Sequence, residues 1–589
     1  MESQEQRVQR PAVRQAARVV AVAGAALLVV GCAQVPLGGD TASEAAVSAP
    51  TVAAAEVLPR SLAGSYLVGS QAMRQFDSGI AQQHIDFVLN AEPENRAVLT
   101  KAFAVSFDNN AYNRAFALAR IFDVSEQKNP LISLALAVED IQRRDYAAAS
   151  KRLNDLPSSS VNRAIGPLLL AWVNLGQGRY DQVEQTLTGL SAFTGFSALT
   201  NLHRALIAAA AGEHAAAIEH FQTAGAHKPP AALRLTLAMA TEFARGDNRQ
   251  AALSLIESRD DPLLDREQVI AHLQRTDSTS PRMSVAEGAA EALFDIASAL
   301  HRERQNGSAL FFARLATYLD PKQALGYLLI GEIHESRAQL QRALDAYQSV
   351  QTNSPFRLMA NLRRAETLDA NGDKAGATAV LTAMMTRQAG NPEPAIRLGD
   401  LHRRSEDWPQ AIAAYDTAIA RLTANEQANW SVYYARGIAL ERAKLWPRAE
   451  RDFLQALTLS PDQPYVMNYL GYSWTDQGIN LDRAEALIEK AAVLLPSDGY
   501  IVDSLGWIKY RRGRFDEAVT HLERAAELRP TDPVINDHLG DAYWHAGRRN
   551  EARFQWRRAQ LFDPDPELRE RLQTKLRDGL TAAGSDDRR

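Results

Sequence analysis

The sequence predicts an all-α superhelical solenoid of antiparallel helix pairs, and three observations support this prediction. A Leu-Gly pair recurs with its glycines 35 and 34 residues apart, at Gly471, Gly506 and Gly540. The runs of β-branched residues are short and do not alternate, so no strand pattern competes. Small residues and prolines return around each glycine at nearly the same spacing: Ala484, Ala518 and Ala552; Ala491, Ala525 and Ala559; Pro461, Pro496, Pro530 and Pro564.

This period is that of the tetratricopeptide repeat (TPR), a pair of antiparallel helices of about 34 residues. Glycine in the first helix and alanine in the second allow two backbones to approach closely. The proline ends the second helix because it cannot continue the hydrogen-bond ladder. In such an array each pair contacts mainly its neighbours, so about 500 residues form one object stacked in single file.

Composition argues against three classes of protein: disordered chains, generic nucleic-acid binders, and proteins held by disulfides or thiolate metal clusters. The 589 residues are 46% hydrophobic and 23% charged, which excludes a wholly disordered chain. Lys+Arg 65 against Asp+Glu 70 gives a net charge of -5, whereas a generic nucleic-acid binder carries excess positive charge. The single cysteine excludes an intramolecular disulfide and a thiolate metal cluster.

Residues 1–31 are predicted to be a lipoprotein signal peptide. Four arginines lie within residues 1–18, and the uncharged run VVAVAGAALLVV follows over residues 19–30. Twelve helical residues span about 18 Å, short of the roughly 30 Å of a bilayer core. The sequence VVGC at its end resembles the bacterial lipobox, which implies cleavage before Cys32 and lipidation of its thiol. The alternative is a cytosolic chain with an apolar start and an incidental cysteine.

Residues 32–59 are predicted to be the lipidated cysteine and a flexible tether. Residues 33–58 are small, contain proline and are nearly uncharged, so they cannot build a core. Residue 33 is alanine, not the aspartate that the lipoprotein resemblance associates with retention in the inner membrane. The resemblance therefore implies an outer-membrane anchor that faces the periplasm.

The rest of the chain is predicted to hold two helical arrays with about fourteen helix pairs, of which the last eight are the most regular. Residues 60–274 read as a degenerate TPR-like array and residues 285–565 as a TPR array. The segment RTDSTSPRMS, residues 275–284, is predicted to be a loop between them. Leucines at 568, 572 and 576 predict a capping helix over 566–580, and residues 581–589 are predicted to be a disordered tail.

The first helices of the last four repeats are predicted to line a concave groove that binds a partner. The repeat register places there a set of aromatic and hydrogen-bonding residues, the composition of interface anchors. An extended peptide could use such a surface. The alternative is that individual aromatics pack between helices without a ligand. The predicted groove residues are Tyr434, Arg442, Tyr465, Asn468, Tyr472, Asp476, Tyr500, Asp503, Trp507, Tyr510, Arg511, Asp537, Asp541, Trp544 and His545.

No catalytic or metal site is predicted, and no cofactor is expected. The pairs His538/His545 and His214/His220 do not match HExxH and are interpreted as surface histidines. There is no Walker A loop and no G-x-S-x-G elbow. A cluster of C-terminal arginines is interspersed with acidic residues and is interpreted as a solvated face.

The segment from Val466 to Pro564 resembles the C-terminal repeats of Gram-negative TPR lipoproteins, among them the adaptor of a periplasmic C-terminal processing protease. The resemblance implies a non-enzymatic, lipid-anchored periplasmic scaffold that presents peptidoglycan hydrolases to an envelope protease. The first alternative is an assembly factor for outer-membrane or secretion machinery. An envelope hydrolase with an attached TPR domain is the alternative of another class, although no non-repeat segment is long enough to house it.

Overall fold

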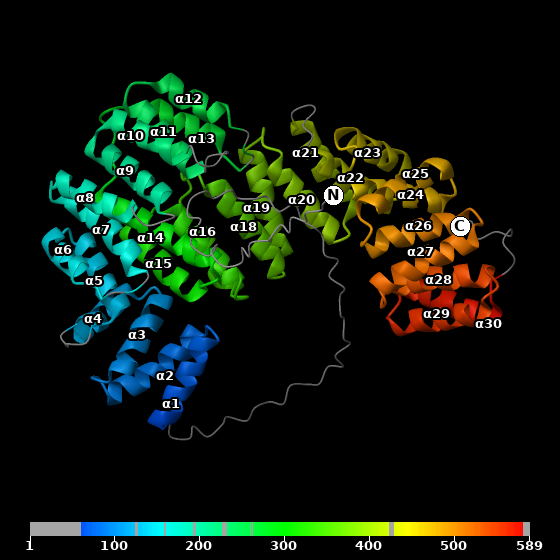
Figure 1. Cartoon of the computed structure of the whole chain (residues 1–589), viewed down its shortest axis with the longest axis horizontal. Helices are drawn as coiled ribbons and strands as arrows, with labels where there is room; N and C mark the ends of the chain where they lie inside the picture. The colour runs from blue at the N-terminus through cyan, green and yellow to red at the C-terminus, as the bar shows by residue number, and fades with distance from the viewer. Residues whose placement is uncertain are drawn as a thin grey trace, which may run out of the picture. The chain divides into compact units, whose positions relative to one another are not determined.

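Every regular element that the structure describes is an α-helix. The computed structural model describes residues 61–123, 128–157, 159, 161–191, 196–225, 233–259, 261, 263–422 and 429–580. No strand occurs among them, and the predicted all-α TPR solenoid is confirmed (Figure 1). The described helices form fourteen successive pairs, in agreement with the predicted number, and the terminal helix α30 lies where a capping helix is predicted. The unpaired helix α13 was not predicted.

The chain divides into two compact units, and the boundary between them along the sequence falls within α19 (Lys374–Arg387). Unit 1 extends to Ala377 and unit 2 begins at Thr378. The other helices of unit 1 are α1 (Leu62–Arg74), α2 (Ser78–Ala91), α3 (Arg96–Asp108), α4 (Tyr112–Asp123), α5 (Pro130–Gln142), α6 (Tyr146–Asn154), α7 (Asn162–Gly176), α8 (Tyr180–Ser191), α9 (Ser197–Ala211), α10 (His214–Gly225), α11 (Leu233–Arg245), α12 (Arg249–Glu257), α13 (Arg266–Arg275), α14 (Val285–Arg302), α15 (Asn306–Leu319), α16 (Ala324–Glu335), α17 (Leu340–Ser349) and α18 (Arg357–Ala370).

The helices of unit 2 follow the regular period of the sequence. They are α20 (Glu393–Arg404), α21 (Trp408–Arg421), α22 (Trp430–Arg442), α23 (Trp446–Leu459), α24 (Pro464–Gln477), α25 (Leu481–Leu494), α26 (Gly499–Arg511), α27 (Phe515–Leu528), α28 (Pro533–His545), α29 (Arg549–Leu561) and α30 (Pro566–Asp578).

The repeated glycine of each first helix makes room for a large side chain of the second helix. A Cβ atom on Gly540 would lie 2.4 Å from the indole ring of Trp556, and one on Gly506 would lie 2.5 Å from Leu522. The same relation joins Gly437 to Phe453. The sequence predicts a close approach of two backbones at these glycines. The backbones do come close, since a Cβ atom on Gly506 would lie 3.2 Å from the backbone nitrogen of Leu522. The structure adds that a buried side chain of the second helix fills the space left by each glycine.

Unit 2 stacks in single file, as predicted. Each of its helix pairs packs on the next pair, and first helices contact first helices from α20 to α22, from α24 to α26 and from α26 to α28. Tyr469 of α24 contacts Tyr434 and Glu441 of α22. Two large apolar cores follow one another along the stack, besides a small one around Met467, Ala491 and Ile501. One is centred on Phe453 and Trp474, and the other on Leu522 and Trp556. Terminal α30 extends the second core with Leu568 and Leu572, which are fully buried.

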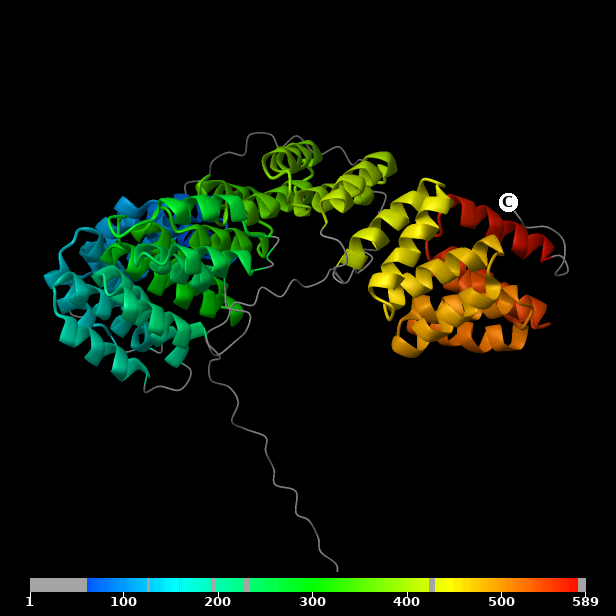
Figure 2. The same cartoon turned by 90° about the horizontal axis from the view of Figure 1, so that it is seen from above.

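Unit 1 departs from the single-file prediction. Helix α14 packs against α5, α7 and α9, which precede it by more than 70 residues, and α15 packs against α3 and α5 (Figures 1 and 2). One apolar core therefore joins the helices before the 276–284 connection to those after it. The prediction of contacts between neighbouring pairs alone is wrong here, because α14 and α15 bury apolar surface on two sides. Leu293 and Phe312, for example, are completely buried.

Polar contacts fix α14 where it crosses the earlier helices. A Cβ atom on Gly288 would lie 2.3 Å from Trp172, so only glycine lets α14 approach α7 this closely. The indole Nε1 of Trp172 donates to Nδ1 of His203, 3.1 Å away. Arg234 of α11 donates to both Glu291 and Asp295 of α14, at 2.9 and 2.6 Å. The contacts of Arg234 therefore join α11, which precedes residue 276, to α14, which follows it.

Several predictions fall outside the described residues. These are the signal peptide over 1–31, Cys32, the tether over 32–59 and the tail over 581–589. Within the described part of the chain, no helix combines the length and apolarity that crossing a membrane requires.

Candidate partner-binding face

The predicted groove residues lie on four first helices of unit 2, α22, α24, α26 and α28. We call these fifteen residues the first-helix face. Two of these helices have N-terminal side-chain caps: the carboxylates of Asp498 and Asp532 accept hydrogen bonds from backbone N–H groups in the first turns of α26 and α28. Prolines begin α24 and α28, where a missing N–H costs little. The repeat register therefore brings the predicted residues to successive helices, and their surroundings differ along the face.

Four residues of the first-helix face are open to solvent. Tyr465 is 46% exposed and Tyr500 is 39% exposed, and both sit in the first turn of their helix. The guanidinium of Arg529 lies 4.9 Å from the ring centre of Tyr500. Arg442 and Asp476 are exposed near the ends of α22 and α24. These side chains can meet a partner without any rearrangement.

A stack of rings connects α26 to α28. Trp507 lies nearly parallel to His538, with ring centres 4.0 Å apart, and to Tyr510, with ring centres 4.8 Å apart. The hydroxyl of Tyr510 is 3.1 Å from Nδ1 of His545. Stacked rings populate few rotamers, so these side chains would lose little conformational entropy on binding a partner.

Three side chains of the face hold a polar atom without a hydrogen-bond partner. These atoms are Oδ1 of Asn468, Nε1 of Trp507 and Nε2 of His545, on α24, α26 and α28. Each atom is closed off by its neighbours, and an unsatisfied polar atom of this kind costs about 1–3 kcal/mol. Native proteins satisfy most such atoms with protein, water or ligand. One acceptor, one donor and one imidazole nitrogen thus stand on successive helices.

Asp503 and His538 form a buried pair, which contradicts the surface interpretation of His538. Nδ1 of His538 is 3.0 Å from both carboxylate oxygens of Asp503, and the histidine is only 7% exposed. Burial lowers the pKa of His538, but the charge and hydrogen bond of Asp503 outweigh it and raise the pKa overall. Sequence spacing missed this pair because the two residues belong to different repeats.

Asp537 and Asp541 are also buried, because α30 covers them. Nζ of Lys575 donates to Asp537 at 2.7 Å and to Asp541 at 2.8 Å. Nε1 of Trp556 donates to the other oxygen of Asp541 at 2.9 Å. Burial raises the pKa of Asp541 to about 6, with Lys575 opposing the shift and Asp537 adding to it. As partner-binding residues, both aspartates stay a prediction that requires α30 to move.

The remaining predicted residues are partly buried. Tyr434 packs among Trp430, Phe453 and Tyr469, and burial raises its pKa to about 12. Burial also raises the pKa of Tyr472, and Arg571 of α30 is among the charges that act on its hydroxyl. Arg511 donates to the carbonyl oxygen of Asp476 at 3.1 Å. The sequence did not single out Tyr469, whose hydroxyl donates to Glu441 at 3.2 Å.

Trp544 supports the fold at the end of the face. Its Nε1 donates to the carbonyl oxygen of Leu580 at 2.9 Å, and its ring packs on Trp556, with centres 5.3 Å apart. A Cβ atom on Gly579 would lie 2.2 Å from the same ring. Removing Trp544 would disturb α30 as well as the face, so other residues give a cleaner test of binding.

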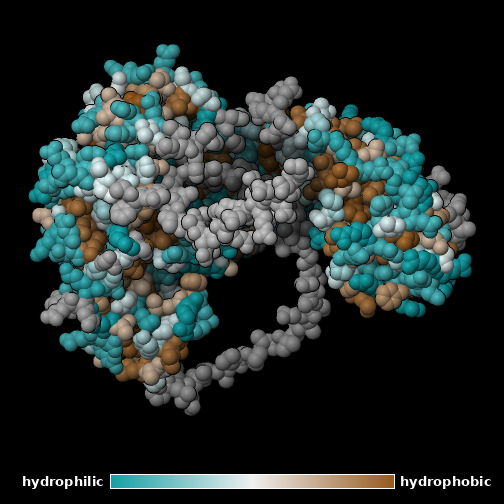
Figure 3. All heavy atoms as spheres, in the orientation of Figure 1, coloured by the Kyte–Doolittle hydropathy of each residue, from teal (hydrophilic) through white to brown (hydrophobic). Residues whose placement is uncertain are grey.

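Among the described residues, no group of three or more His, Cys, Asp or Glu side chains could hold a metal ion. On the side of the molecule drawn in Figure 3, apolar residues form small separate spots among hydrophilic ones. Exposed apolar area alone therefore does not select an interface.

Comparisons with known proteins agree with this architecture. A tetratricopeptide repeat model matches residues 396–464, and a TPR repeat model matches residues 506–547. Both segments are tetratricopeptide repeats. They lie in unit 2 and include residues of the first-helix face. The TPR prediction is confirmed, while the resemblance to protease-adaptor lipoproteins stays a prediction.

A curated relative and several solved structures are similar to parts of the chain. Over 205 residues the chain is 30% identical to the TPR repeat-containing protein PA4667 of Pseudomonas aeruginosa. The aligned region covers 32% of this chain and 31% of the relative. The match thus spans about a third of that protein's length. MamA AMB-1 is 25% identical over 28% of this chain and 95% of its own, with a TM-score of 0.25. YrrB, described as a TPR protein with an unusual peptide-binding site, is 19% identical to this chain, with a TM-score of 0.27. The match covers 33% of this chain and 97% of YrrB.

Proposed function

We propose that this chain is a non-enzymatic scaffold whose first-helix face binds an extended segment of a partner protein. The observation that carries the proposal is the row of solvent-exposed side chains on three successive first helices, Arg442, Tyr465, Asp476 and Tyr500. Exposed aromatic side chains bind a partner at small entropic cost. The matched repeats support a protein-interaction role, since TPR arrays present surfaces to peptides and proteins.

The setting of this scaffold is the second part of the proposal. Lipidation of Cys32 would hold the chain at the outer membrane, facing the periplasm, and the binding face would bring an envelope protease to peptidoglycan hydrolases. Holding two partners together raises their effective concentration without any chemistry. The lipobox-like VVGC and the resemblance over residues 466–564 support this setting. An assembly factor for outer-membrane or secretion machinery is the second candidate.

The binding proposal is tested with a substitution that removes one exposed ring of the first-helix face. Tyr465→Ala truncates a side chain that is 46% exposed in the first turn of α24. We expect capture of the partner from crosslinked envelopes to fall by about fivefold to thirtyfold, because truncating an aromatic anchor of an interface costs about 1–2 kcal/mol. The matched control is Phe554→Ala, which removes an exposed ring from the second helix α29 and should capture as well as the unchanged chain.

The identity of the captured proteins decides between the two settings. Recovery of a protease or a peptidoglycan hydrolase supports the adaptor role. Recovery of assembly proteins alone supports the second candidate. Equal capture by Tyr465→Ala, Phe554→Ala and the unchanged chain would show that the first-helix face does not bind the partner.

A further inference from the structure

A hollow of about 550 Å³ opens in unit 1 where three connections between helices meet. These connections are far apart in the sequence, and Figure 1 shows α1 and α2 close to α15 and α16. Gln339 ties two of them together, since its Nε2 donates to the carbonyl oxygen of Phe76 at 2.7 Å. The hollow is lined by Phe76 from the α1–α2 connection, Arg304 and Gln305 from the α14–α15 connection, Asn306, Gly307 and Ser308 from the start of α15, and Ser336 and Arg337 from the α16–α17 connection.

The lining is rich in hydrogen-bond donors. Arg304 and Arg337 come from different connections and both border the hollow. The guanidinium of Arg337 rests 3.9 Å from the ring centre of Phe76, which holds the side chain in place. Helix α15 begins without a side-chain cap, so the N–H groups of its first turn find no acceptor within the described chain. The helix N-terminus adds partial positive charge at the same place.

The two arginines that line the hollow form no ion pair within the part of the chain that the structure describes. Arg304 is exposed and Arg337 is partly buried, and neither forms a salt bridge with a described carboxylate. Nε of Arg337 is buried without a hydrogen-bond partner. Arg314, outside the lining, already donates to Asn110 and to the carbonyl oxygen of Asp108. A bound anion would give Arg304 and Arg337 a salt-bridge partner.

The titration behaviour of the group agrees with this geometry. Burial lowers the pKa of Arg337, and the charges of Arg314 and Arg342 lower it further, while Asp108 opposes the shift. Burial likewise lowers the pKa of His334 to about 4, so this neighbour is neutral at pH 7 and adds no charge. Arg304 and Arg337 are the cations that line the hollow, and Asp108 is a carboxylate that acts on Arg337.

We propose that this hollow binds a phosphate group. Two guanidiniums, the N–H groups of the first turn of α15 and the hydroxyl of Ser308 offer donors from several directions, which suits a tetrahedral oxyanion. The hydroxyl of Ser336 already donates to the carbonyl oxygen of Ile333. The phosphate can be free or part of a phospholipid headgroup, and the recognition chemistry is the same. Bound phosphate would join the α1–α2 connection to α15 and α16. This site is independent of the partner-binding role proposed for unit 2.

Inorganic phosphate added to the full chain provides the first test. We expect amides of α1 and α2 to become more protected from hydrogen exchange as phosphate rises, beyond the effect of sodium chloride at equal ionic strength. In Arg304→Gln/Arg337→Gln, half-saturation should need at least about tenfold more phosphate, because two charge-assisted contacts are lost. The matched control is Arg302→Gln, an exposed arginine outside the lining, which should behave as the unchanged chain does.

Arg304→Gln alone is the second variant, since it leaves the packing of Arg337 on Phe76 intact. Its helicity should match the unchanged chain, and its half-saturation should lie between those of the chain and the double variant. Equal response to phosphate and chloride, or equal half-saturation in all variants, would overturn the proposal.

Vesicles distinguish the two sources of phosphate. Binding to phosphatidylglycerol vesicles that is lost in the double variant, with none to phosphatidylcholine vesicles, identifies a lipid headgroup. Phosphate-dependent protection without arginine-dependent vesicle binding identifies free phosphate. Both results retain the site, whereas vesicle binding that is the same in the double variant, together with no phosphate response, rejects it.

Discussion

At the residue scale, glycines on first helices act through the side chains opposite them. A Cβ atom on Gly540 would lie 2.4 Å from the fully buried ring of Trp556, whereas one on Gly189 near the end of α8 would meet nothing within 4 Å. The same substitution therefore has opposite effects at the two positions. Space, and not helix propensity, decides the outcome at Gly540.

We expect Gly540→Ala to destabilise unit 2 by about 1–3 kcal/mol, the usual cost of overpacking a core. Gly189→Ala should stabilise its helix by about 0.5–1 kcal/mol, because alanine loses less backbone entropy than glycine. Urea titration followed by circular dichroism measures both changes. A neutral Gly540→Ala would mean that Trp556 can shift freely.

The buried charges around Asp541 make the stability of unit 2 depend on pH. Burial raises the pKa of Asp541 to about 6 from its ordinary 3.8, so its contribution is complete below pH 3.8 and is lost as pH rises through about 6. The raised pKa of His538 acts in the same direction above pH 6.5. Asp503, Asp537 and Lys575 are the other charged groups that act on these two, and Trp556 donates a hydrogen bond to Asp541.

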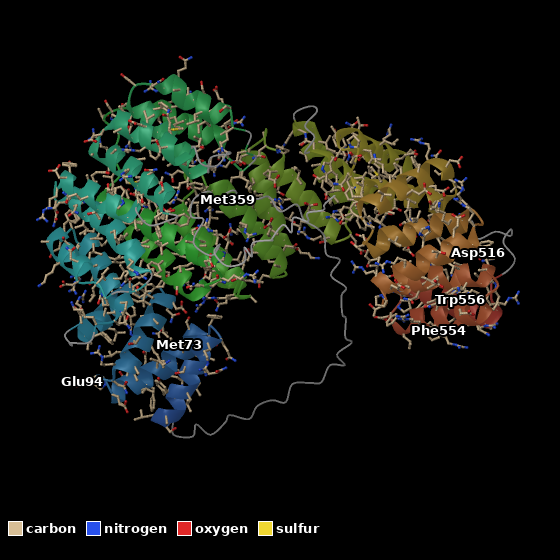
Figure 4. All side chains as sticks on the ribbon, viewed as in Figure 1. Met73, Glu94, Met359, Asp516, Phe554 and Trp556 are labelled. Atoms are coloured by element: carbon tan, nitrogen blue, oxygen red, sulfur yellow. The ribbon has the colours of Figure 1, made fainter. Side chains whose placement is uncertain are left out.

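We expect Asp541→Asn to flatten the fall in stability between pH 5 and pH 7.5 by about 1–3 kcal/mol, since about 1.4 kcal/mol corresponds to one pKa unit. The amide can still accept the hydrogen bond of Trp556. Asp516→Asn is the control, because Asp516 is exposed on α27, away from the buried Trp556 (Figure 4). Unfolding temperatures across pH give the comparison, and parallel curves for all three proteins would contradict the assignment.

At the scale of elements, α14 determines how unit 1 is built. The helix carries a capping box at Ser284 and Glu287, so the sequence starts it locally. Its place against α7 depends on Gly288, whose missing side chain admits the ring of Trp172. Local signals thus make the helix, and contacts with helices more than 70 residues earlier place it.

We expect Gly288→Val to push α14 away from α7 and to raise hydrogen exchange in both helices. Unit 2 should keep its protection, because its cores contain no residue of α7 or α14. Gly307→Ala is the comparison, since a Cβ atom there meets nothing within 4 Å. Mass spectrometry of peptides from both units reads out the result, and unchanged exchange in α7 would show that the contact is dispensable.

At the scale of the whole molecule, the proposed role depends on where the chain is held. In the proposed role, the lipid at Cys32 attaches the chain to the membrane. We expect Cys32→Ser to move the protein from the membrane to the soluble fraction of lysed cells, with its helicity unchanged. Retention of the variant on membranes would remove the lipid anchor from the proposal.

The sequence by itself determined the repeat, because its signals are local. Glycine, alanine and proline at a fixed period specify each helix pair, and the fourteen pairs and the single-file stack of unit 2 follow from them. It also placed exposed candidates such as Tyr465 and Tyr500 correctly on the first helices.

Only the tertiary structure decided which repeats meet out of order and which polar residues are buried. The packing of α14 on α7, the pairing of Asp503 with His538, and the cover that Lys575 places over Asp537 all join residues from different repeats. Sequence periodicity repeats the same pattern in every unit, so it cannot tell which copy will face another. The physical reason is that burial and charge pairing are settled between repeats, after the helices of each repeat have formed.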